Sequence, residues 1–319
     1  MKTIDIVVPC YNEEEGLETF ISTTDKVIDS LPQYSFRYLL INDGSTDKTY
    51  LVMKKAAEKK DNVKYISFSR NFGKEAAIFA GLQHSDAQYV IVMDADLQHS
   101  PELFPEMIQA VENEGFDCCA VKRISRKGEK PMRKAFSKLF FKLSSAMTDI
   151  SMPYGAMDYR ILTRQMVNAI LELSEVQRFS KGIFSWVGFN TKWLSTDTAQ
   201  RQAGKSAWNF SSLFKYALDG IISFSVTPLR MIAALGAVVF AVSVVYIIIT
   251  LIQTLFFGIT VPGYVTTLCS VLFLGGLTQM SIGVLGEYIG RIYMETKKRP
   301  IYIIHHTNLS DDEKSRNEE

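Results

Sequence analysis

The sequence predicts an α/β domain, built on a parallel sheet with helices on both faces and followed by a two-helix transmembrane hairpin. Two patterns carry this prediction. In the amino-terminal part, short apolar and β-branched runs alternate with stretches of helical periodicity, which is typical of a parallel sheet covered by helices. Nearer the carboxyl terminus, residues 231–286 contain no Asp, Glu, Lys, Arg or His, a length that suits two membrane-spanning helices and a turn.

Four apolar runs predict the strands of the sheet. The expected strands are Ile4–Val8, Tyr38–Ile41, Val63–Phe68 and Tyr89–Met93. Apolar residues at helical spacing predict helices between Leu17 and Ile28 and from about Glu75 to Gln83. Ser100 and Pro101 mark a further helix start, as N-cap and first helical residue.

Two carboxylates, Asp94 and Asp96, follow the last of these strands. Side chains two residues apart on an extended chain project to one face, so both can reach one cation. Carboxyl ends of parallel strands meet at one edge of a sheet, where such folds bind ligands. The polar residues expected at this edge are Pro9, Tyr11, Asn12, Glu13, Asp43, Arg70, Lys74, Asp94, Asp96 and Gln98. Taken alone, Asp-x-Asp is also compatible with a solvated loop.

The remaining composition limits the partners. The 319 residues allow about two structural units, and a net charge of +1 gives no global field for nucleic acid, so none is expected as a partner. Cys10, Cys118, Cys119 and Cys269 lack metal or pairing spacing, which indicates reduced packing residues in a cytosol-facing protein. Met1 leads directly into a strand, so no signal peptide is expected.

The two spans are expected near Met231–Phe257 and Tyr264–Gly286, joined by Gly258–Gly263. Arg230 precedes the first span and Arg291 follows the second, whereas the turn is uncharged. The positive-inside rule therefore places the amino-terminal α/β domain and both termini in the cytoplasm, with two spans in the cell membrane. A buried hairpin in a soluble protein is the alternative.

Four motifs stand at the expected strand ends: Val8-Pro-Cys-Tyr-Asn-Glu-Glu14, Asn42-Asp-Gly-Ser-Thr-Asp47, Asn71-Phe-Gly-Lys74 and Asp94-Ala-Asp-Leu-Gln98. Together they resemble the family 2 glycosyltransferases of the GT-A fold. More closely, they resemble the polyprenyl-phosphate glycosyltransferases, which include dolichyl-phosphate mannose synthase and the bactoprenol glucosyltransferases. The resemblance extends over about residues 3–295.

This resemblance implies a single, inverting transfer from UDP-glucose or UDP-N-acetylglucosamine to undecaprenyl or another polyprenyl phosphate at the cytosolic membrane face. The nucleotide-sugar site would comprise Pro9, Tyr11, Asn12, Glu13, Asp43, Lys74, Asp94, Arg201 and Lys205. Asp94, Asp96 and Gln98 would surround Mg²⁺ or Mn²⁺, for which oxygen ligands are suitable. Catalysis would involve Asp158, Asp96 and Arg123, and the acceptor phosphate would meet Arg123, Arg133, Ser137 and Arg160.

The acceptor side is expected to lie against the membrane. Residues 122–142 hold nine Lys or Arg against one acid, and a basic, aromatic-bearing helix at about 131–149 is typical of contact with anionic lipid. An ordinary surface helix is the alternative. Asp158 matches the family's acid near the acceptor, although a turn acid paired with Arg160 is a competing interpretation.

The loop Arg201–Ser206 resembles the family's Arg-x-x-Gly-x-Ser-Lys pattern, but Ala207 stands where the lysine should follow and Lys205 precedes the serine. We expect four regions: a GT-A catalytic domain at 1–209, a juxtamembrane amphipathic helix at 210–227, two transmembrane helices at 228–293 and a cytosolic tail at 294–319.

Two other functions are alternatives to transfer onto a lipid phosphate. A membrane-anchored nucleotide-sugar binder that aids lipid-sugar translocation would not need both a metal set and a cationic acceptor face. A polysaccharide synthase should carry more spans and a Gln-x-x-Arg-Trp box, whereas this chain has Gln177-Arg-Phe179. The sequence leaves a homo-oligomer open.

Overall fold

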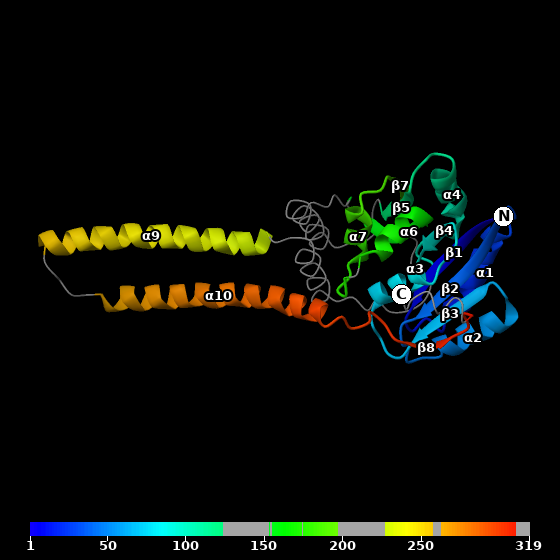
Figure 1. The fold of residues 1–319 in the computed structure, drawn as a ribbon, viewed down its shortest axis with the longest axis horizontal. Coiled ribbons are helices and arrows are strands. Elements are labelled where there is room, and N and C mark those ends of the chain that lie inside the picture. Colours follow the sequence, from blue (N-terminus) through cyan, green and yellow to red (C-terminus); the bar gives the residue numbers. More distant parts are fainter. Residues whose placement is uncertain (124–152, 154, 174, 197–226, 258–262, 311–319) are drawn as a thin grey trace. The chain divides into compact units, whose positions relative to one another are not determined.

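The computed structural model describes residues 1–123, 153, 155–173, 175–196, 227–257 and 263–310, and the chain divides into two units (Figure 1). Unit 1 comprises Met1–Gly220 and Arg299–Glu319, and unit 2 comprises Ile221–Lys298. Several expected features lie outside the described residues: the helix at about 131–149, the Arg201–Ser206 loop, most of the helix at 210–227, the turn at 258–262 and the tail beyond 310.

Unit 1 is built on an eight-stranded sheet in the order β7-β5-β6-β4-β1-β2-β3-β8. Its strands are β1 (Lys2–Cys10), β2 (Tyr34–Asn42), β3 (Val63–Phe68), β4 (Tyr89–Val92), β5 (Cys118–Arg123), β6 (Ala156–Thr163), β7 (Thr191–Thr196) and β8 (Ile304–Thr307). The four expected strands are confirmed as β1–β4, and β1 pairs in parallel with β2 on one side and β4 on the other.

The expected parallel sheet is confirmed for β1–β4. The complete sheet is mixed, because β6 and β8 run antiparallel to their neighbours. The direction of β6 follows from the edge of the sheet at which this strand begins. The backbone N–H of Arg123, the last residue of β5, donates to the carbonyl of Gly155, just before β6. The chain thus enters β6 at the edge where β5 ends and runs back between β5 and β4, which requires an antiparallel ladder.

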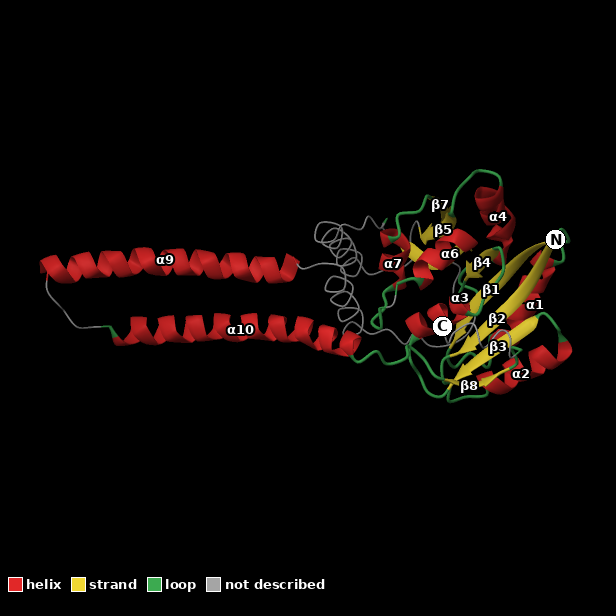
Figure 2. Cartoon of the chain, viewed as in Figure 1, coloured by secondary structure: helices red, strands yellow, loops and turns green. Residues whose placement is uncertain are grey.

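Helices cover both faces of the sheet (Figure 2). They are α1 (Leu17–Ile28), α2 (Thr49–Lys59), α3 (Lys74–Gln83), α4 (Phe104–Glu112), α6 (Arg164–Leu171) and α7 (Ser180–Trp186), with a 3₁₀ turn η1 at Pro101–Leu103. The expected start at Ser100 is confirmed, since its hydroxyl accepts the backbone N–H of Glu102 and Pro101 opens the turn. Gly81 lets α3 approach β1, because a Cβ there would lie 2.2 Å from Val7 Cγ1.

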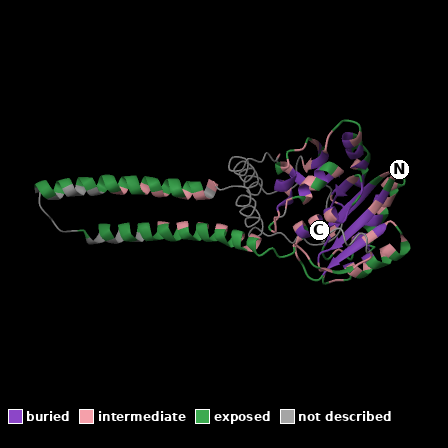
Figure 3. Ribbon diagram, viewed as in Figure 1, coloured by how far each residue is buried: buried purple, intermediate pink, exposed green. Residues whose placement is uncertain are grey.

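The core lies between the sheet and its helices, and the strands are its most buried part (Figure 3). Alternate residues of β1, Ile4, Ile6 and Val8, pack with α1 and α4 in one cluster. Cys10, Cys118 and Cys119 are free and buried, as expected of packing residues.

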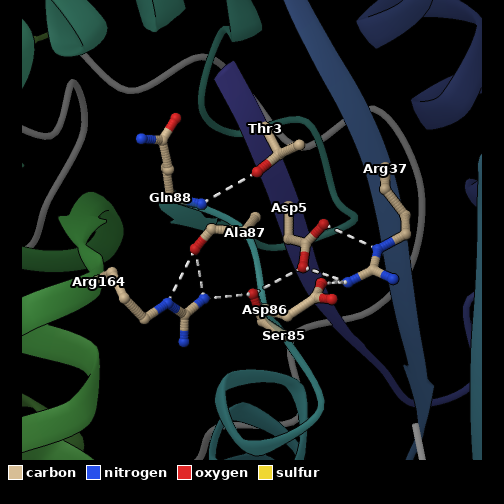
Figure 4. Close-up of polar contacts among 8 residues, drawn as sticks. All are labelled: Thr3, Asp5, Arg37, Ser85, Asp86, Ala87, Gln88 and Arg164. Carbon is tan, nitrogen blue, oxygen red and sulfur yellow. Dashed lines mark hydrogen bonds and ion pairs between the residues drawn. The ribbon is translucent and has the colours of Figure 1, made fainter. Parts of the chain in front are cut away.

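A network of charged and polar side chains links β1 and β2 to a neighbouring loop and to α6 (Figure 4). Asp5 on β1 is only 1% exposed and receives the Arg37 guanidinium at 2.9 and 2.7 Å, and the Ser85 hydroxyl at 2.6 Å. Arg164 of α6 joins by donating to Ser85 Oγ and to the carbonyl of Ala87. Two strands, one loop and one helix are thereby held together.

The last described segment returns to unit 1 as an edge strand. Here β8 pairs antiparallel with β3, and Tyr302 stacks on Phe68 with ring centroids 4.9 Å apart. The Asn308 amide accepts the N–H of Tyr65 at 2.7 Å and donates to the carbonyl of Val63 at 3.1 Å. The expected tail at 294–319 did not include this strand.

Unit 2 contains two long helices, α9 (Thr227–Phe257) and α10 (Tyr264–Thr296), at the positions of the two expected spans. Among the residues that the structure describes, one stretch, Leu229–Tyr246 in α9, is long and apolar enough to cross a membrane. None of that stretch is buried inside the protein, and large apolar side chains such as Val238 and Phe240 are exposed on it. The second span stays a prediction.

Changing Arg37 to Met should lower the free energy of unfolding by about 3–5 kcal/mol, because it leaves the buried Asp5 carboxylate without its cation. Urea unfolding of the detergent-solubilised protein, followed by near-UV circular dichroism, measures this. The matched control is Lys192→Met, which breaks an exposed pair with Glu114 and should barely change the unfolding midpoint. Equal effects of the two changes would contradict the structural importance of the Asp5 network.

Changing Asn308 to Ala should destabilise the protein by about 1–3 kcal/mol, because Tyr65 N–H and Val63 C=O lose their partner at the sheet edge. Thermal unfolding of the full-length protein measures the loss. His305→Ala, at an exposed position of β8, is the control and should have a smaller effect. A stability unaffected by Asn308→Ala would show that β8 contributes nothing to unit 1.

Candidate functional site

The candidate site lies where the parallel strands of unit 1 end. Cys10 at the end of β1 is level with Asn42 at the end of β2, and Asn42 is level with Ser67 of β3. On the other side of β1, Val7 is level with Val92 at the end of β4. The loops that follow β1, β2, β3 and β4 therefore meet at one edge, as the sequence predicted.

The loops after β1 and β2 interlock through Asn12. Its backbone, at a φ of 55°, has the left-handed conformation that Asn tolerates well. The Asn12 side-chain oxygen accepts the N–H of Thr46 at 2.9 Å, and its own N–H donates to Ser45 Oγ at 3.0 Å. Asn12 thus shapes the loop, while the neighbouring Tyr11 is 47% exposed.

Asp43, at the end of β2, is buried and secures the loop before α3. Its carboxylate accepts the backbone N–H groups of Phe72 at 2.7 Å and Gly73 at 3.0 Å. Burial raises the pKa of Asp43, although these hydrogen bonds oppose the rise. Gly44 is required beside it, because a Cβ there would lie 2.2 Å from the backbone of Arg70.

Lys74, the first residue of α3, joins two carboxylates. Its Nζ lies 2.6 Å from Asp94 Oδ1 and 2.7 Å from Asp158 Oδ2. Burial by itself would lower the pKa of Lys74, but the charges of Asp158 and Asp94 outweigh it and raise that pKa above its ordinary value. Donor-side and acceptor-side residues predicted from separate motifs are therefore bridged by one ammonium group.

Asp158 lies near the start of β6 and faces a second lysine, Lys181 of α7, at 4.0 Å. Burial would raise the pKa of Asp158, but Lys181, Lys74 and Arg160 outweigh it and hold that pKa below its ordinary value. Lys181 was not predicted, because no motif marks it. Its position depends on Glu75, whose carboxylate accepts the N–H of Ser180 at 2.7 Å and also its hydroxyl.

Asp94 and Asp96 follow β4, and Asp96 Oδ1 accepts the backbone N–H of Gln98 at 3.1 Å. The carboxylate oxygens of Asp94 and Asp96 are ligands that suit a hard divalent ion. Asp94 Oδ1 already binds one cation, the ammonium group of Lys74. Within the described residues, no three or more His, Cys, Asp or Glu side chains are arranged around one metal position.

Arg160 does not lie at an acceptor surface. It is 3% exposed, donates to the carbonyls of Met157 and Asp158, and lies 4.0 Å from the Phe184 ring centroid. The expected contact with an acceptor phosphate finds no support in this position. The competing pairing with Asp158 is also not the main contact, because Lys74 takes that place.

Arg123 ends β5 at the same edge as the other site residues, since β5 runs in the direction of β4. Gly155 lets the chain turn beside it, because a Cβ at that position would lie 2.5 Å from the Arg123 carbonyl oxygen. Four further predicted site residues, Arg133, Ser137, Arg201 and Lys205, lie outside the described residues.

Two family profiles match the chain. Glycosyl transferase family 2 matches residues 5–171, and the GtrB C-terminal hairpin matches residues 227–292. The fold is similar to that of a mycobacterial protein solved by crystallography, with a TM-score of 0.50 and 16% identity, covering 69% of this chain and 73% of that protein.

Relatives match along almost the whole chain. The putative glycosyltransferase CsbB of Bacillus subtilis is 45% identical over 306 residues, covering 96% of this chain and 92% of the relative. A prophage bactoprenol glucosyl transferase homolog of Escherichia coli is 40% identical, covering 94% and 98%. The bactoprenol glucosyl transferase of Shigella phage SfV is 41% identical, covering 94% and 97%. The chain is therefore a glycosyltransferase and belongs to glycosyl transferase family 2.

Proposed function

We propose that the protein transfers one glucosyl residue from UDP-glucose to a polyprenyl phosphate, of which undecaprenyl phosphate is the expected form. The observation that carries the proposal is the Lys74 bridge, which brings the acid of the donor side, Asp94, within reach of the acid of the acceptor side, Asp158. Glucose is preferred over N-acetylglucosamine because relatives that match 94% of the chain bear the name bactoprenol glucosyl transferase.

On the donor side, the exposed ring of Tyr11 and the carboxylate of Asp43 would hold the nucleoside. Asp94, Asp96 and Gln98 would hold Mg²⁺ or Mn²⁺. When bound, such an ion neutralises charge that builds up on the departing UDP diphosphate. Arg201 and Lys205 keep their expected role as further diphosphate contacts.

On the acceptor side, the main task is to hold an anionic phosphate, and this task falls to cations. A phosphate monoester has its second pKa near 6, so its attacking oxygen is already largely anionic at pH 7. Lys181 and Arg123, with Arg133 and Ser137, would hold this anion near the donor. Its oxygen then forms a bond to the sugar's anomeric carbon while the bond to UDP breaks, which inverts that carbon in one displacement. Asp158 would orient Lys74 and Lys181 and remove no proton.

The acceptor lipid requires a membrane location. We infer that α9 and α10 both span the bilayer, with the catalytic domain and both termini in the cytoplasm. Support comes from the hairpin profile over 227–292 and from the apolar stretch Leu229–Tyr246. Arg230 near the start of α9 and Arg291 near the end of α10 add support, because cations favour the cytoplasmic side.

The decisive experiment uses purified full-length protein with radiolabelled UDP-glucose and undecaprenyl phosphate. Formation of a labelled, organic-extractable lipid with release of UDP supports the proposal. UDP-N-acetylglucosamine, tested in parallel, should give less product. Nucleotide binding without any lipid product would favour the accessory-subunit alternative.

Changing Asp96 to Asn should reduce lipid glucosylation by about 10²-fold or more, because an amide is a poor ligand for a hard cation that contributes several kcal/mol to the reaction. EDTA should abolish activity and added Mn²⁺ or Mg²⁺ should restore it. Asp61→Asn is the matched control, since this exposed acid precedes β3 at the opposite edge of the sheet. Full activity in EDTA would contradict the metal requirement.

Changing Asp158 to Asn should lower kcat at saturating lipid phosphate without moving the acidic limb of the pH profile. Asp158 has a lowered pKa and is ionised throughout pH 5–8, so we expect a limb near pH 6 to come from the acceptor phosphate. The loss should also be smaller than the about 10²–10⁴-fold that removal of a general base typically costs. Disappearance of the limb in the variant would show that Asp158 titrates as a base.

A further inference from the structure

We propose that Lys74 is an exchangeable cation of the metal site: it holds the Asp94 carboxylate in the unloaded enzyme, and a divalent ion must displace it to bind. This inference rests on the proposed role of Asp94 and Asp96 as metal ligands. It assigns to Lys74 control over when the ion binds, in addition to the expected contact with the nucleotide sugar.

The geometry sets up a competition for one carboxylate. Lys74 Nζ lies 2.6 Å from Asp94 Oδ1, which is the distance of a direct, charge-assisted hydrogen bond. A divalent ion coordinated by the same group would stand within a few ångströms of the ammonium, and two cations that close repel each other strongly outside bulk water. The ion therefore binds Asp94 at the expense of the Lys74 contact.

Asp158 can keep the Lys74 ammonium group bound after Asp94 has released it. It holds Lys74 Nζ at 2.7 Å through Oδ2, and its side chain is less exposed than that of Asp94, at 16% against 32%. Lys74 can thus release Asp94 while keeping one ion pair. The exchange needs a small movement of a long side chain that is 40% exposed, and no rearrangement of α3.

The nucleotide should favour this exchange. A diphosphate brings negative charge and further oxygen ligands, so it stabilises the ion and gives the released ammonium a second partner. Metal alone should then bind weakly, and metal with UDP should bind tightly. Because such coupling is reciprocal, the metal should raise the affinity for UDP by the same factor.

Lys181 provides a matched control. It is also a lysine of this cluster, 4.0 Å from Asp158, but the described contacts link it to Asp158 and not to Asp94. Removing its charge changes the overall field of the site, whereas removing Lys74 also frees the metal ligand. If displacement matters, the two lysine substitutions must differ in their effect on metal binding.

The test measures Mn²⁺ binding to the full-length protein in detergent, from the electron paramagnetic resonance signal of free Mn²⁺, without nucleotide and then with UDP. Lys74→Met should tighten Mn²⁺ binding without nucleotide by about tenfold, the value of one charge-assisted hydrogen bond. Lys181→Met should change it less than about threefold. UDP should improve Mn²⁺ binding more in the natural protein than in Lys74→Met.

Lys74→Gln serves as a second neutral variant if Lys74→Met fails to fold, and Lys74→Arg should keep the weak binding of the natural protein. The inference is overturned if the neutral Lys74 variants bind Mn²⁺ no more tightly than the natural protein, or if Lys181→Met gives the same gain. Should the natural protein fail to bind Mn²⁺ even with UDP, the metal part of the proposed function fails as well.

Discussion

The site depends on the parallel pairing of β1 with both of its neighbours. Because β2 and β4 run in the same direction as β1, the loops that follow them open at the same edge of the sheet. Tyr11, Asp43 and Asp94 come to the same edge for that reason, although the first and the last are 83 positions apart in the sequence. A slip of one residue in either pairing would exchange the side chains that face the two layers of helices, so the packed core also fixes the site.

The antiparallel strand β6 adds what parallel strands alone could not. A strand that runs the other way has its beginning at the edge where the parallel strands end, and Asp158 is the third residue of β6. This places Asp158 within reach of Lys74, which also contacts Asp94. The mixed sheet therefore supports a two-substrate reaction at one edge, with a single lysine between the two halves.

The sequence was informative where local patterns are strong. Strands β1–β4 contain dense apolar runs, so they could be predicted, whereas α2 buries only Thr49 and Met53 and β8 consists of Ile-His-His-Thr, a partly exposed edge strand. The motifs located Asp94 and Asp96, but they could not show that Lys74 meets Asp158, because that contact depends on the direction of β6. Arg160 was expected beside Asp158 at the acceptor. It lies two residues, or about 7 Å, further along the strand, where it is buried.

The closing of the sheet edge by β8 has a consequence for how the protein is made. Residues 304–307 are translated after both long helices of unit 2, yet they pair with β3, which is translated more than 200 residues earlier. Until then the edge of β3 presents unpaired N–H and C=O groups, a surface that can join other chains. Unit 1 therefore reaches its final form only after α9 and α10 have been synthesised, which couples completion of the sheet edge to the synthesis of both helices.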